Sequence, residues 1–476
     1  MSDQPRRYED LAGFVTALVE NGTLRAGMRA PSLRKVAAQH KASMSTALQA
    51  YRLLEDRGVL EARPRSGFYV AAGSRVALDK PAVSSPPPKA AKVTVTPGIT
   101  DLLEHAANPE LVPLGCAIPS AELLAAGRLD RFLARAARTK GTDYNIYTEP
   151  RGDAELRAEI ARRALRWGQV VAPGDTAITC GCTEALSLAL RAVTKRGDTV
   201  AIESPTYFGL LQVLESLGLK ALELPTDATK GIETDALEKA LASKPVRACL
   251  FSSSFNNPLG FAMSEAKKRR IVDLLEAHGV PLIEDDIYGD IYFGKERPKP
   301  FMALRPKADI LYCSSFSKTV APGYRVGWIT AARHIDRILE EKFALTLCGP
   351  ALPQVAIAAF LASGGYDSHL RRMRLVFADH IDRMTRAIGR SFPASTRVTR
   401  PAGGFVLWLE LPAGFDSRQL FDRALTKGIC FAPGDVFSAA GRYRNCLRLS
   451  CGHAWDARIE KSIGTLGKMV HRQLED

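Results

Sequence analysis

Hydrophobic and polar positions follow different patterns in different parts of the chain. In the first 75 residues, several stretches place apolar side chains three and four positions apart, as amphipathic helices do, and two short alternating stretches follow. Beyond residue 98, helical patterns alternate with strand-like apolar runs, which predicts an α/β fold with a mainly parallel sheet. Residues 76–98 have neither period and are rich in Pro, Ser, Ala and Lys. We therefore expect domains at 1–75 and 99–476, joined by a flexible linker at 76–98.

The first domain shows the pattern of a winged helix-turn-helix. A helix is predicted over Tyr8–Glu20, a second should begin near Ser32, and Ser43 can cap a third. The run VLEARPRSGFYV predicts a basic hairpin, the wing. The third helix of such a unit enters the major groove, so the polar side chains near its start are candidates for reading bases: Ser43, Ser45, Thr46 and Gln49. A helical docking module, in which these hydroxyls only cap, is the alternative.

Two stretches, GTLRAGMRAPSLRKVAAQ and RPRSGFYV, resemble the winged helix of the GntR family. The resemblance implies double-stranded DNA as a partner. It assigns DNA contacts to Arg34, Ser43, Ser45, Thr46 and Gly67. Lys41 stands where that family usually has a glycine in the turn between the helices, which puts the geometry of this turn in doubt.

Composition and net charge exclude few classes of protein. With 46% apolar and 24% charged residues, the chain can bury globular cores. The 65 Lys and Arg against 51 Asp and Glu give a net charge of +14, which favours polyanions but does not separate DNA from small phosphates. The nine cysteines lack C-x-x-C spacing, so no metal site is expected. Without a secretory signal or a long apolar run, we expect a cytoplasmic chain that associates with the nucleoid on DNA and makes no membrane contact.

The most specific chemical motif is SSFSKTVAPGYRVGW, which follows a strand-like run. Lys318 can form a Schiff base with an aldehyde, and Ser315, Ser317 and Arg325 provide the hydroxyls and the cation that suit a phosphate. A solvated Lys-Arg loop is the alternative for a lone lysine, but the joint occurrence of these groups disfavours it.

Other polar side chains follow apolar strand-like runs, where they can emerge at the carboxyl edge of a parallel sheet. Asp285 can protonate a pyridine nitrogen, and Tyr288 and Asn257 can hydrogen-bond a ring oxygen, although solvated loop ends explain them equally.

Three further positions complete this candidate site. The amides near Cys182 and Thr183 begin a predicted helix and can receive phosphate, or simply cap that helix. Tyr207 can stack on a ring or pack in a core. Arg448 lies in an apolar strand, where an unpaired cation is expensive and a carboxylate ligand would offset the cost.

Residues 110–470 resemble fold type I aminotransferases, and their combination with a winged helix resembles the MocR subfamily of GntR regulators. The resemblance implies pyridoxal 5'-phosphate as cofactor, a small C-terminal α+β subdomain and a homodimer. It assigns Lys318 as the residue that binds the aldehyde, Asp285 to the pyridine nitrogen, Asn257 and Tyr288 to the ring hydroxyl, Tyr207 to stacking, Cys182, Thr183, Ser315 and Arg325 to the phosphate, and Arg448 to a carboxylate.

The stretch YNIYTEPRGDAELRAEI matches a family segment whose tyrosine, here Tyr147, reaches the phosphate of the neighbouring subunit. Cys182 replaces the more frequent small hydroxyl residue, so its side-chain contact is in doubt while its amide is unaffected.

Our leading hypothesis is a transcription regulator in which the cofactor, or its adduct with an amino compound, alters DNA binding. The alternative is a working aminotransferase for an amino acid or amine, with Lys318 moving the α-proton and Arg448 holding the carboxylate. A protein-interaction factor with a retired cofactor pocket is a third possibility.

Overall fold

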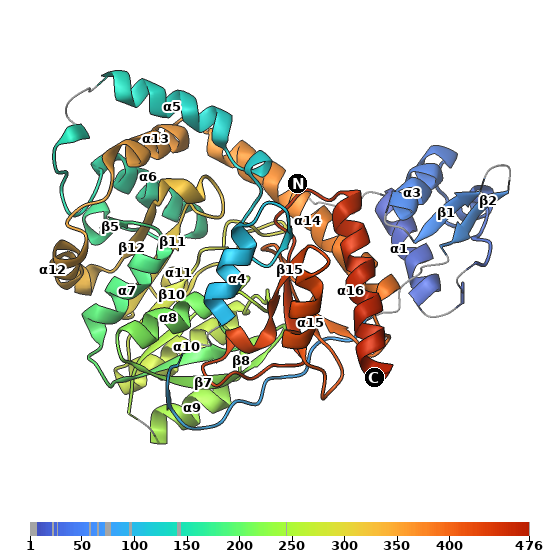
Figure 1. Cartoon of the computed structure of the whole chain (residues 1–476). Coiled ribbons are helices and arrows are strands. Elements are labelled where there is room, and N and C mark those ends of the chain that lie inside the picture. Colours follow the sequence, from blue (N-terminus) through green and yellow to red (C-terminus); the bar gives the residue numbers. More distant parts are fainter. Residues whose placement is uncertain are drawn as a thin grey trace. The chain divides into compact units, whose positions relative to one another are not determined.

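The computed structural model describes residues 7–20, 23–25, 27–56, 59–63, 66–71, 78–94, 98–139, 144–243 and 245–475. The chain divides into two compact units, residues 1–77 and 78–476, and each is considered by itself (Figure 1). No helix within these described ranges is both long and apolar enough to cross a bilayer.

The first unit is a winged helix-turn-helix. Its elements are α1 (Arg7–Glu20), α2 (Leu33–Gln39), α3 (Met44–Asp56), β1 (Leu60–Arg63) and β2 (Gly67–Val70). The two strands pair antiparallel, as predicted for the wing. The three helices and the hairpin share one core, in which the Tyr51 ring is fully buried and meets Phe68 edge-on at 5.1 Å.

Local capping and backbone geometry explain the turn between α2 and α3. The hydroxyl of Ser32 accepts a hydrogen bond from the Lys35 amide at 3.3 Å and so begins α2. Lys41 adopts φ 49°, the left-handed conformation that glycine adopts at lower cost. The turn therefore forms despite the substitution. The predicted stop at Asn21-Gly22 and the wing tip at Pro64-Arg65 lie outside the described residues.

The second unit is built on a large, mainly parallel sheet, as predicted. Its order is β3-β7-β6-β9-β10-β11-β12-β5, with β8 pairing β7. Strands β7, β6, β9, β10 and β11 run parallel to one another. Strands β3 and β8 are antiparallel to β7, and β12 is antiparallel to β11 and β5. The strands are β3 (Ala91–Lys92), β5 (Thr176–Thr179), β6 (Thr199–Ser204), β7 (Lys220–Asp227), β8 (Gly231–Ile232), β9 (Val246–Phe251), β10 (Leu282–Asp285), β11 (Ile310–Ser315) and β12 (Gly327–Thr330).

Helices cover both faces of this sheet (Figure 1). Alternate strand residues face opposite ways: Val200 and Ile202 pack with α7, α8 and α12, while Ala201 belongs to the core that contains α9 and α10. The helices are α4 (Gly98–Ala107), α5 (Ala126–Thr139), α6 (Ala154–Ala164), α7 (Cys182–Val193), α8 (Phe208–Ser216), α9 (Thr234–Ser243), α10 (Glu265–His278), α11 (Phe301–Leu304), α12 (Ile335–Leu345), α13 (Ala351–Ala362), α14 (Gly365–Ser391), α15 (Ser417–Leu425) and α16 (Ala457–Glu475).

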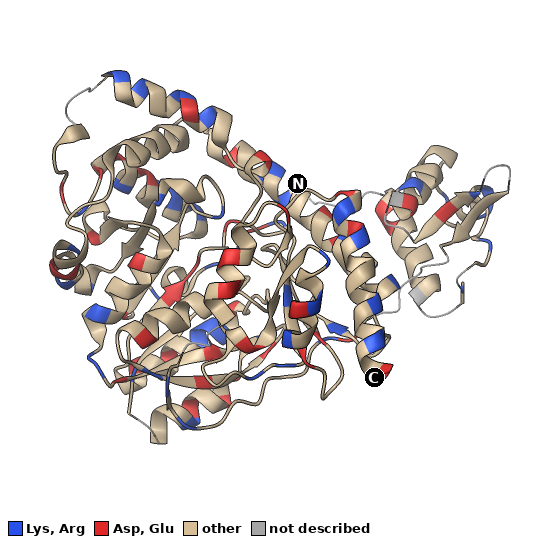
Figure 2. Ribbon diagram, in the orientation of Figure 1, with Lys and Arg blue, Asp and Glu red and all other residues tan. Residues whose placement is uncertain are grey.

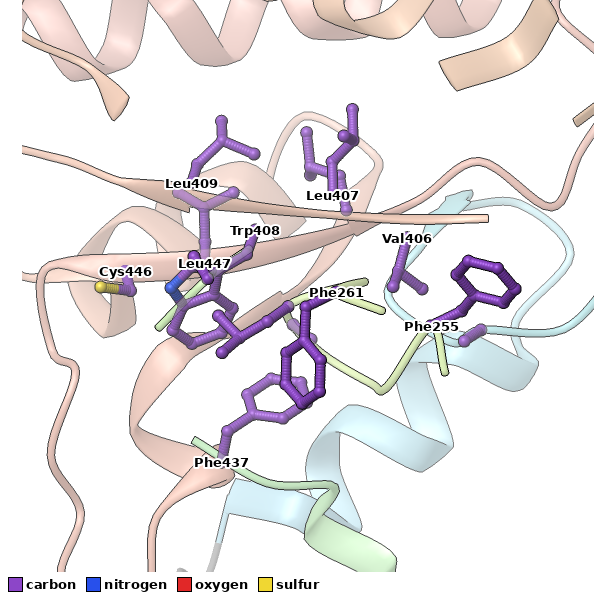
Figure 3. Close-up of a cluster of buried hydrophobic side chains, with 14 of the residues drawn as sticks. Phe255, Phe261, Val406, Leu407, Trp408, Leu409, Phe437, Cys446 and Leu447 are labelled. Atoms are coloured by element: carbon purple, nitrogen blue, oxygen red, sulfur yellow. The ribbon is translucent and has the colours of Figure 1, made fainter. Parts of the chain in front are cut away.

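A second, smaller sheet has the order β13-β14-β16-β15-β4. Its strands are β4 (Val112–Leu114), β13 (Arg397–Val398), β14 (Val406–Glu410), β15 (Ile429–Pro433) and β16 (Cys446–Ser450). Figure 3 shows Leu407 and Leu409 on one side of β14 and Trp408 on the other, where its ring meets Phe437 edge-on at 5.4 Å. The C-terminal subdomain thus recruits one strand, β4, from far earlier in the chain.

The expected linker is wrong over residues 78–94, which are bound to the second unit. Ala91–Lys92 pairs with β7, and the Ala82 amide donates to Glu410 Oε2 at 2.9 Å. The amide of Ser84 donates to the Thr226 carbonyl at 3.1 Å, and its hydroxyl accepts from the Thr226 amide at 2.7 Å. The Pro-rich composition predicted a flexible linker, but hydrogen bonds to distant strands, which composition does not reveal, fix this segment in place.

We predict that Trp408→Ala lowers the free energy of unfolding of the second unit by about 3–5 kcal/mol, because it leaves a large cavity beneath β14. Trp408 is 2% exposed. Guanidinium unfolding followed by circular dichroism measures the change. The matched control is Phe343→Ala, whose side chain is 63% exposed and whose effect should stay within about 0.5 kcal/mol. Equal effects of the two variants would contradict this core assignment.

Candidate functional site

The candidate site is a cavity of about 210 Å³ at the carboxyl edge of the large sheet. Its walls come from the ends of β6, β9, β10 and β11, the first turn of α7, and Arg448 of the small sheet. The lining residues are Leu103, Cys116, Ala117, Ile118, Cys182, Thr183, Leu186, Glu203, Thr206, Tyr207, Phe208, Leu210, Leu250, Ser252, Asn257, Asp285, Ile287, Tyr288, Ser317, Lys318, Arg325 and Arg448. Most of the predicted cofactor residues are therefore brought together.

Lys318 presents its amine to this cavity. Its Nζ donates to the Ala117 carbonyl at 2.7 Å, which holds the side chain across from the loop after β4. Burial and the nearby Arg448 cation lower the pKa of Lys318 to about 8. About a tenth of the amine is therefore neutral, and nucleophilic, at pH 7, far more than for an ordinary lysine.

Asp285 ends β10 and faces the first turn of α7. Its Oδ1 accepts from the Ile287 amide at 3.2 Å and lies 3.6 Å from the Cys182 Sγ. Burial raises the pKa of Asp285 to about 6, and the Lys318 cation opposes that rise. A positively charged partner in the cavity would favour the ionised carboxylate.

Three neutral groups share the cavity with Asp285. Tyr288 is 5% exposed and Asn257 is 8% exposed, and the Asn257 Oδ1 has no hydrogen-bond partner within the described part of the chain. The ring of Tyr207 lies 4.8 Å from that of Phe208, and burial raises the pKa of the Tyr207 hydroxyl to about 12. All three side chains therefore stay neutral at ordinary pH.

The other end of the cavity combines a helix N-terminus with a guanidinium. Gly181, at φ 82°, precedes α7. The amides of Cys182 and Thr183 therefore belong to the first turn of this helix, which lines the cavity. Arg325 Nη2 donates to the Cys180 carbonyl at 2.9 Å, and a Cβ at Gly181 would stand 2.3 Å from this nitrogen. The positive φ of Gly181 favours glycine here, and the helix amides together with the guanidinium suit an anion.

Of the two predicted serines, Ser317 lines this cavity and Ser315 does not. Ser315 is 3% exposed, its hydroxyl accepts from the Ser317 amide at 3.3 Å, and it lines a separate small cavity on the other side of the sheet edge. The prediction that Ser315 contacts the same ligand as Arg325 therefore has no support from this arrangement.

Arg448 is a buried cation with free donors. It is 0% exposed and its Nη2 donates to the Gly115 carbonyl, while Nε and Nη1 have no hydrogen-bond partner among the described residues. Burial lowers the pKa of Arg448 from its usual range. Because unpaired buried donors are costly, an acceptor such as a carboxylate would be bound favourably here.

An ion network that the sequence did not reveal holds the loop after β10. Arg297 pairs with Asp286 and, at 2.9 Å, with Asp290, and its guanidinium lies 4.2 Å from the Trp167 ring centre. Arg163 pairs with Asp290 at 3.1 Å. These cations hold the pKa of Asp290 well below its usual range. Asp286 follows Asp285 directly, and Asp286 and Asp290 lie on either side of Tyr288, so the network fixes the backbone that carries Asp285 and Tyr288.

Further lining residues were also missed. Glu203 ends an apolar strand just as Asp285 does, and this pattern could have identified it; burial raises its pKa well above the usual range. Cys116 and Ala117 follow a three-residue strand that pairs with β15, a long-range contact that local sequence does not reveal.

Tyr147 does not line this cavity and is 82% exposed. The DNA candidates lie in the first unit, with Arg34, Ser43, Ser45 and Gly67 exposed and Thr46 half-buried. The hydroxyl of Ser43 accepts from the Thr46 amide at 3.1 Å and so caps α3. Gly67 opens β2 at φ 100°, which favours glycine.

The two units of the chain match two different known families. Residues 7–70 match the gntR family of bacterial regulatory proteins, and residues 122–464 match aminotransferase class I and II. The HTH-type transcriptional regulators YdcR and YjiR of Escherichia coli are 38% and 36% identical to this chain, and each alignment covers 98% of the chain and 100% of the relative.

Among solved structures, LysN, an alpha-aminoadipate aminotransferase from Thermus thermophilus, superposes with a TM-score of 0.74 at 30% identity, covering 80% of this chain and 96% of LysN. A winged helix fused to a class I and II aminotransferase fold defines one class of regulator. The chain belongs to the MocR subfamily of GntR transcription regulators.

We predict that Lys318 reacts with a neutral acylating reagent along a titration curve centred near pH 8, because burial favours the free amine. Below that pH the protonated amine is unreactive, and above it the rate levels off. Mass spectrometry of the peptide that contains Lys318 measures the rate. Lys318→Ala is the control and should remove this labelled site, and a midpoint above pH 10 would contradict the burial of the amine.

Proposed function

We propose that this chain is a DNA-binding transcription regulator whose second unit binds pyridoxal 5'-phosphate together with an amino compound. The observation that carries the proposal is a single cavity with a nucleophilic lysine, an anion-binding helix start and a buried arginine with two free donor nitrogens. When bound, the cofactor supplies an aldehyde that combines with amines and a ring that withdraws electrons.

The residues present fit this cofactor. Lys318 would bind its aldehyde carbon, Asp285 would face the pyridine nitrogen, and the free Asn257 Oδ1 marks an amide whose bonding is incomplete without a ligand. Tyr288 would hydrogen-bond the ring oxygen beside Asn257, and Tyr207 would stack on the ring. Arg448 would then hold the carboxylate of an amino acid.

The phosphate would lie at the start of α7. The amides of Cys182 and Thr183 and the Arg325 guanidinium would bind it. The exposed Tyr147 would reach the phosphate of a partner subunit in a homodimer. The family assigns Ser315 to the phosphate as well, but the geometry favours the Ser317 hydroxyl.

The first unit would read double-stranded DNA. Arg34 and the polar start of α3, with Ser45 and Thr46, are available to a major groove, and Gly67 lets the wing approach a phosphate backbone. The E. coli relatives are named as transcriptional regulators, which supports this role. Such a regulator acts in the cytoplasm, on the nucleoid.

A chain of hydrogen bonds offers a route between the two functions. Ser84, seven residues beyond the first unit, bonds the backbone of Thr226 twice, and the Thr226 hydroxyl accepts from the Ser204 amide at 3.1 Å. Thr206 and Tyr207, which line the cavity, follow two and three residues later. A ligand that contacts Tyr207 would therefore affect the position of Ser84, in the segment that leads to the DNA reader.

Transamination is the second candidate, and the depressed pKa of Lys318 favours it specifically. A lysine amine with a pKa of about 8 can take up and return a proton near neutral pH. Transamination requires a group that moves the proton and a group that orients the substrate. Lys318 would move the proton, and Arg448 would orient the substrate carboxylate. Conversion of the bound cofactor to its amine form by an amino-acid donor would establish this activity beside regulation.

We predict that borohydride reduction of the full chain with pyridoxal 5'-phosphate attaches a pyridoxyl group to Lys318, and that the cofactor changes the Kd for DNA from upstream of its gene severalfold. Mass spectrometry and fluorescence anisotropy measure the two effects. Lys318→Ala should show neither the modification nor the cofactor-dependent change. Wild-type protein that retains no pyridoxyl group would contradict the cofactor assignment, and the absence of specific DNA binding would contradict the regulator.

We predict that Thr226→Val reduces the cofactor-dependent change in Kd for DNA, because it removes the hydroxyl that joins the Ser204 amide to the strand bonded to Ser84. The ratio of the Kd values with and without cofactor measures this coupling. Thr465→Val is the matched control, since that hydroxyl bonds only within its own helix, to the Lys461 carbonyl. An unchanged ratio in Thr226→Val, with cofactor retained, would contradict the proposed route.

A further inference from the structure

Helix α5 of the second unit carries a stripe of arginines. Arg128, Arg131, Arg135 and Arg138 are spaced three, four and three residues apart, and all are exposed. Figure 2 shows basic positions, in blue, recurring along α5. At about 100° per residue they fall within an arc of about 80°. With a rise of about 1.5 Å per residue, the stripe is about 15 Å long. The helix therefore presents one continuous cationic edge.

The rest of α5 shows why this edge faces outward. Leu129 and Ala136 are buried, and the Phe132 ring lies 6.2 Å from Phe360 of α13, so a separate face packs against the unit. The one acidic residue of the helix, Asp130, is oriented toward Tyr324 and contributes to raising its pKa, after burial. Among the described residues, Asp130 makes no ion pair with the arginine stripe.

The arginine stripe carries no ion pair among the described residues. Within the described ranges, the side chains of Arg131, Arg135 and Arg138 have no hydrogen-bond or ion-pair partner, and Arg128 makes one long bond, 3.5 Å, to the Gly365 carbonyl. Several exposed arginines elsewhere in this unit do pair with neighbouring acids. These paired arginines include Arg337, Arg383 and Arg390.

Positive charge continues from α5 onto α14. Burial lowers the pKa of His369, and the cations of Arg372 and Arg128 lower it further. Arg372 of α14 and Arg128 of α5 therefore both lie near this imidazole. Arg371 and Arg372 are exposed. The groups that face His369 from α5, α14 and the loop after β11 are Arg128, Arg372 and the Thr319 carbonyl, none of which is an acid.

We propose that the arginine stripe of α5 is a second DNA-binding surface, which contacts the phosphates of duplex DNA beside the sequence bound by the winged helix. Unpaired arginines in a row suit a polyanion with closely spaced charges, and duplex DNA carries one charge per about 1.7 Å of its axis. Duplex DNA is the polyanion that the proposed reader in the same chain brings near. The stripe would add affinity without adding sequence information.

The test replaces three arginines with glutamine in the full chain: Arg131→Gln, Arg135→Gln and Arg138→Gln together. The probe is a long labelled duplex from upstream of its gene. If each arginine neutralises one phosphate, the slope of log K against log salt should fall in magnitude by about 2.7. Hydroxyl-radical footprinting should show that protection outside the central site is lost and that the central protection remains.

A matched triple variant controls for net charge: Arg337→Gln, Arg383→Gln and Arg390→Gln remove the same three charges from paired positions and should keep the wild-type slope and footprint. Equal slopes for wild type and the stripe variant, with the central footprint intact, would overturn the stripe proposal alone. A wild type that leaves no footprint would contradict the DNA reader as well. Stripe-dependent binding of an RNA duplex but not of DNA would overturn the choice of DNA.

Discussion

The candidate site depends on the parallel register of β9, β10 and β11, which aligns three carboxyl ends at one edge. Ile283 faces the core that contains α7, so Asp285, two residues later on the same face, meets the first turn of α7 at Cys182. A slip of one residue would turn Asp285 toward the opposite face. The neighbouring strands end at the same level and deliver Asn257 and Lys318 to the same cavity. The chemistry of the site therefore follows from strand pairing.

The register of the strands does not by itself fix the conformation of the loop after β10. The ion pairs around Arg297 fix it. Asp286 and Asp290 are buried acids, and each would be expensive without a cation. Since Arg297 bonds both, it closes the loop across Ile287 and Tyr288, and its stacking on Trp167 ties the loop to the segment after α6. Removing Arg297 would leave the buried Asp286 without a cation, so the closed loop is strongly favoured. Tyr288 is positioned as a consequence.

Much of this arrangement could be predicted from sequence, because the relevant groups follow apolar runs at short range. The winged helix, the mainly parallel sheet and the gathering of Lys318, Asp285, Asn257 and Arg325 all rest on such local patterns. What failed depended on contacts between distant segments. Residues 78–94 read as a flexible linker because their bonds to Thr226 and Glu410 cannot be seen in composition. The contact of Ser315 with a phosphate stays a prediction, and that Ser315 and Ser317 line different cavities is a tertiary feature that local sequence does not reveal.

The unpaired donor nitrogens of Arg448 help to explain why this cavity suits a protein that senses a ligand. A ligand shifts an equilibrium between two conformations only by the difference in its affinity for them. A buried guanidinium with two unpaired donors makes the empty cavity costly, so a carboxylate ligand gains more there than from an exposed arginine. The cavity lies two residues from Ser204, whose amide reaches the strand bonded to Ser84. Free energy gained by a ligand at Arg448 and Tyr207 would then be available to the segment that leads to the first unit, whereas binding of the same ligand elsewhere on the surface would not reach that segment.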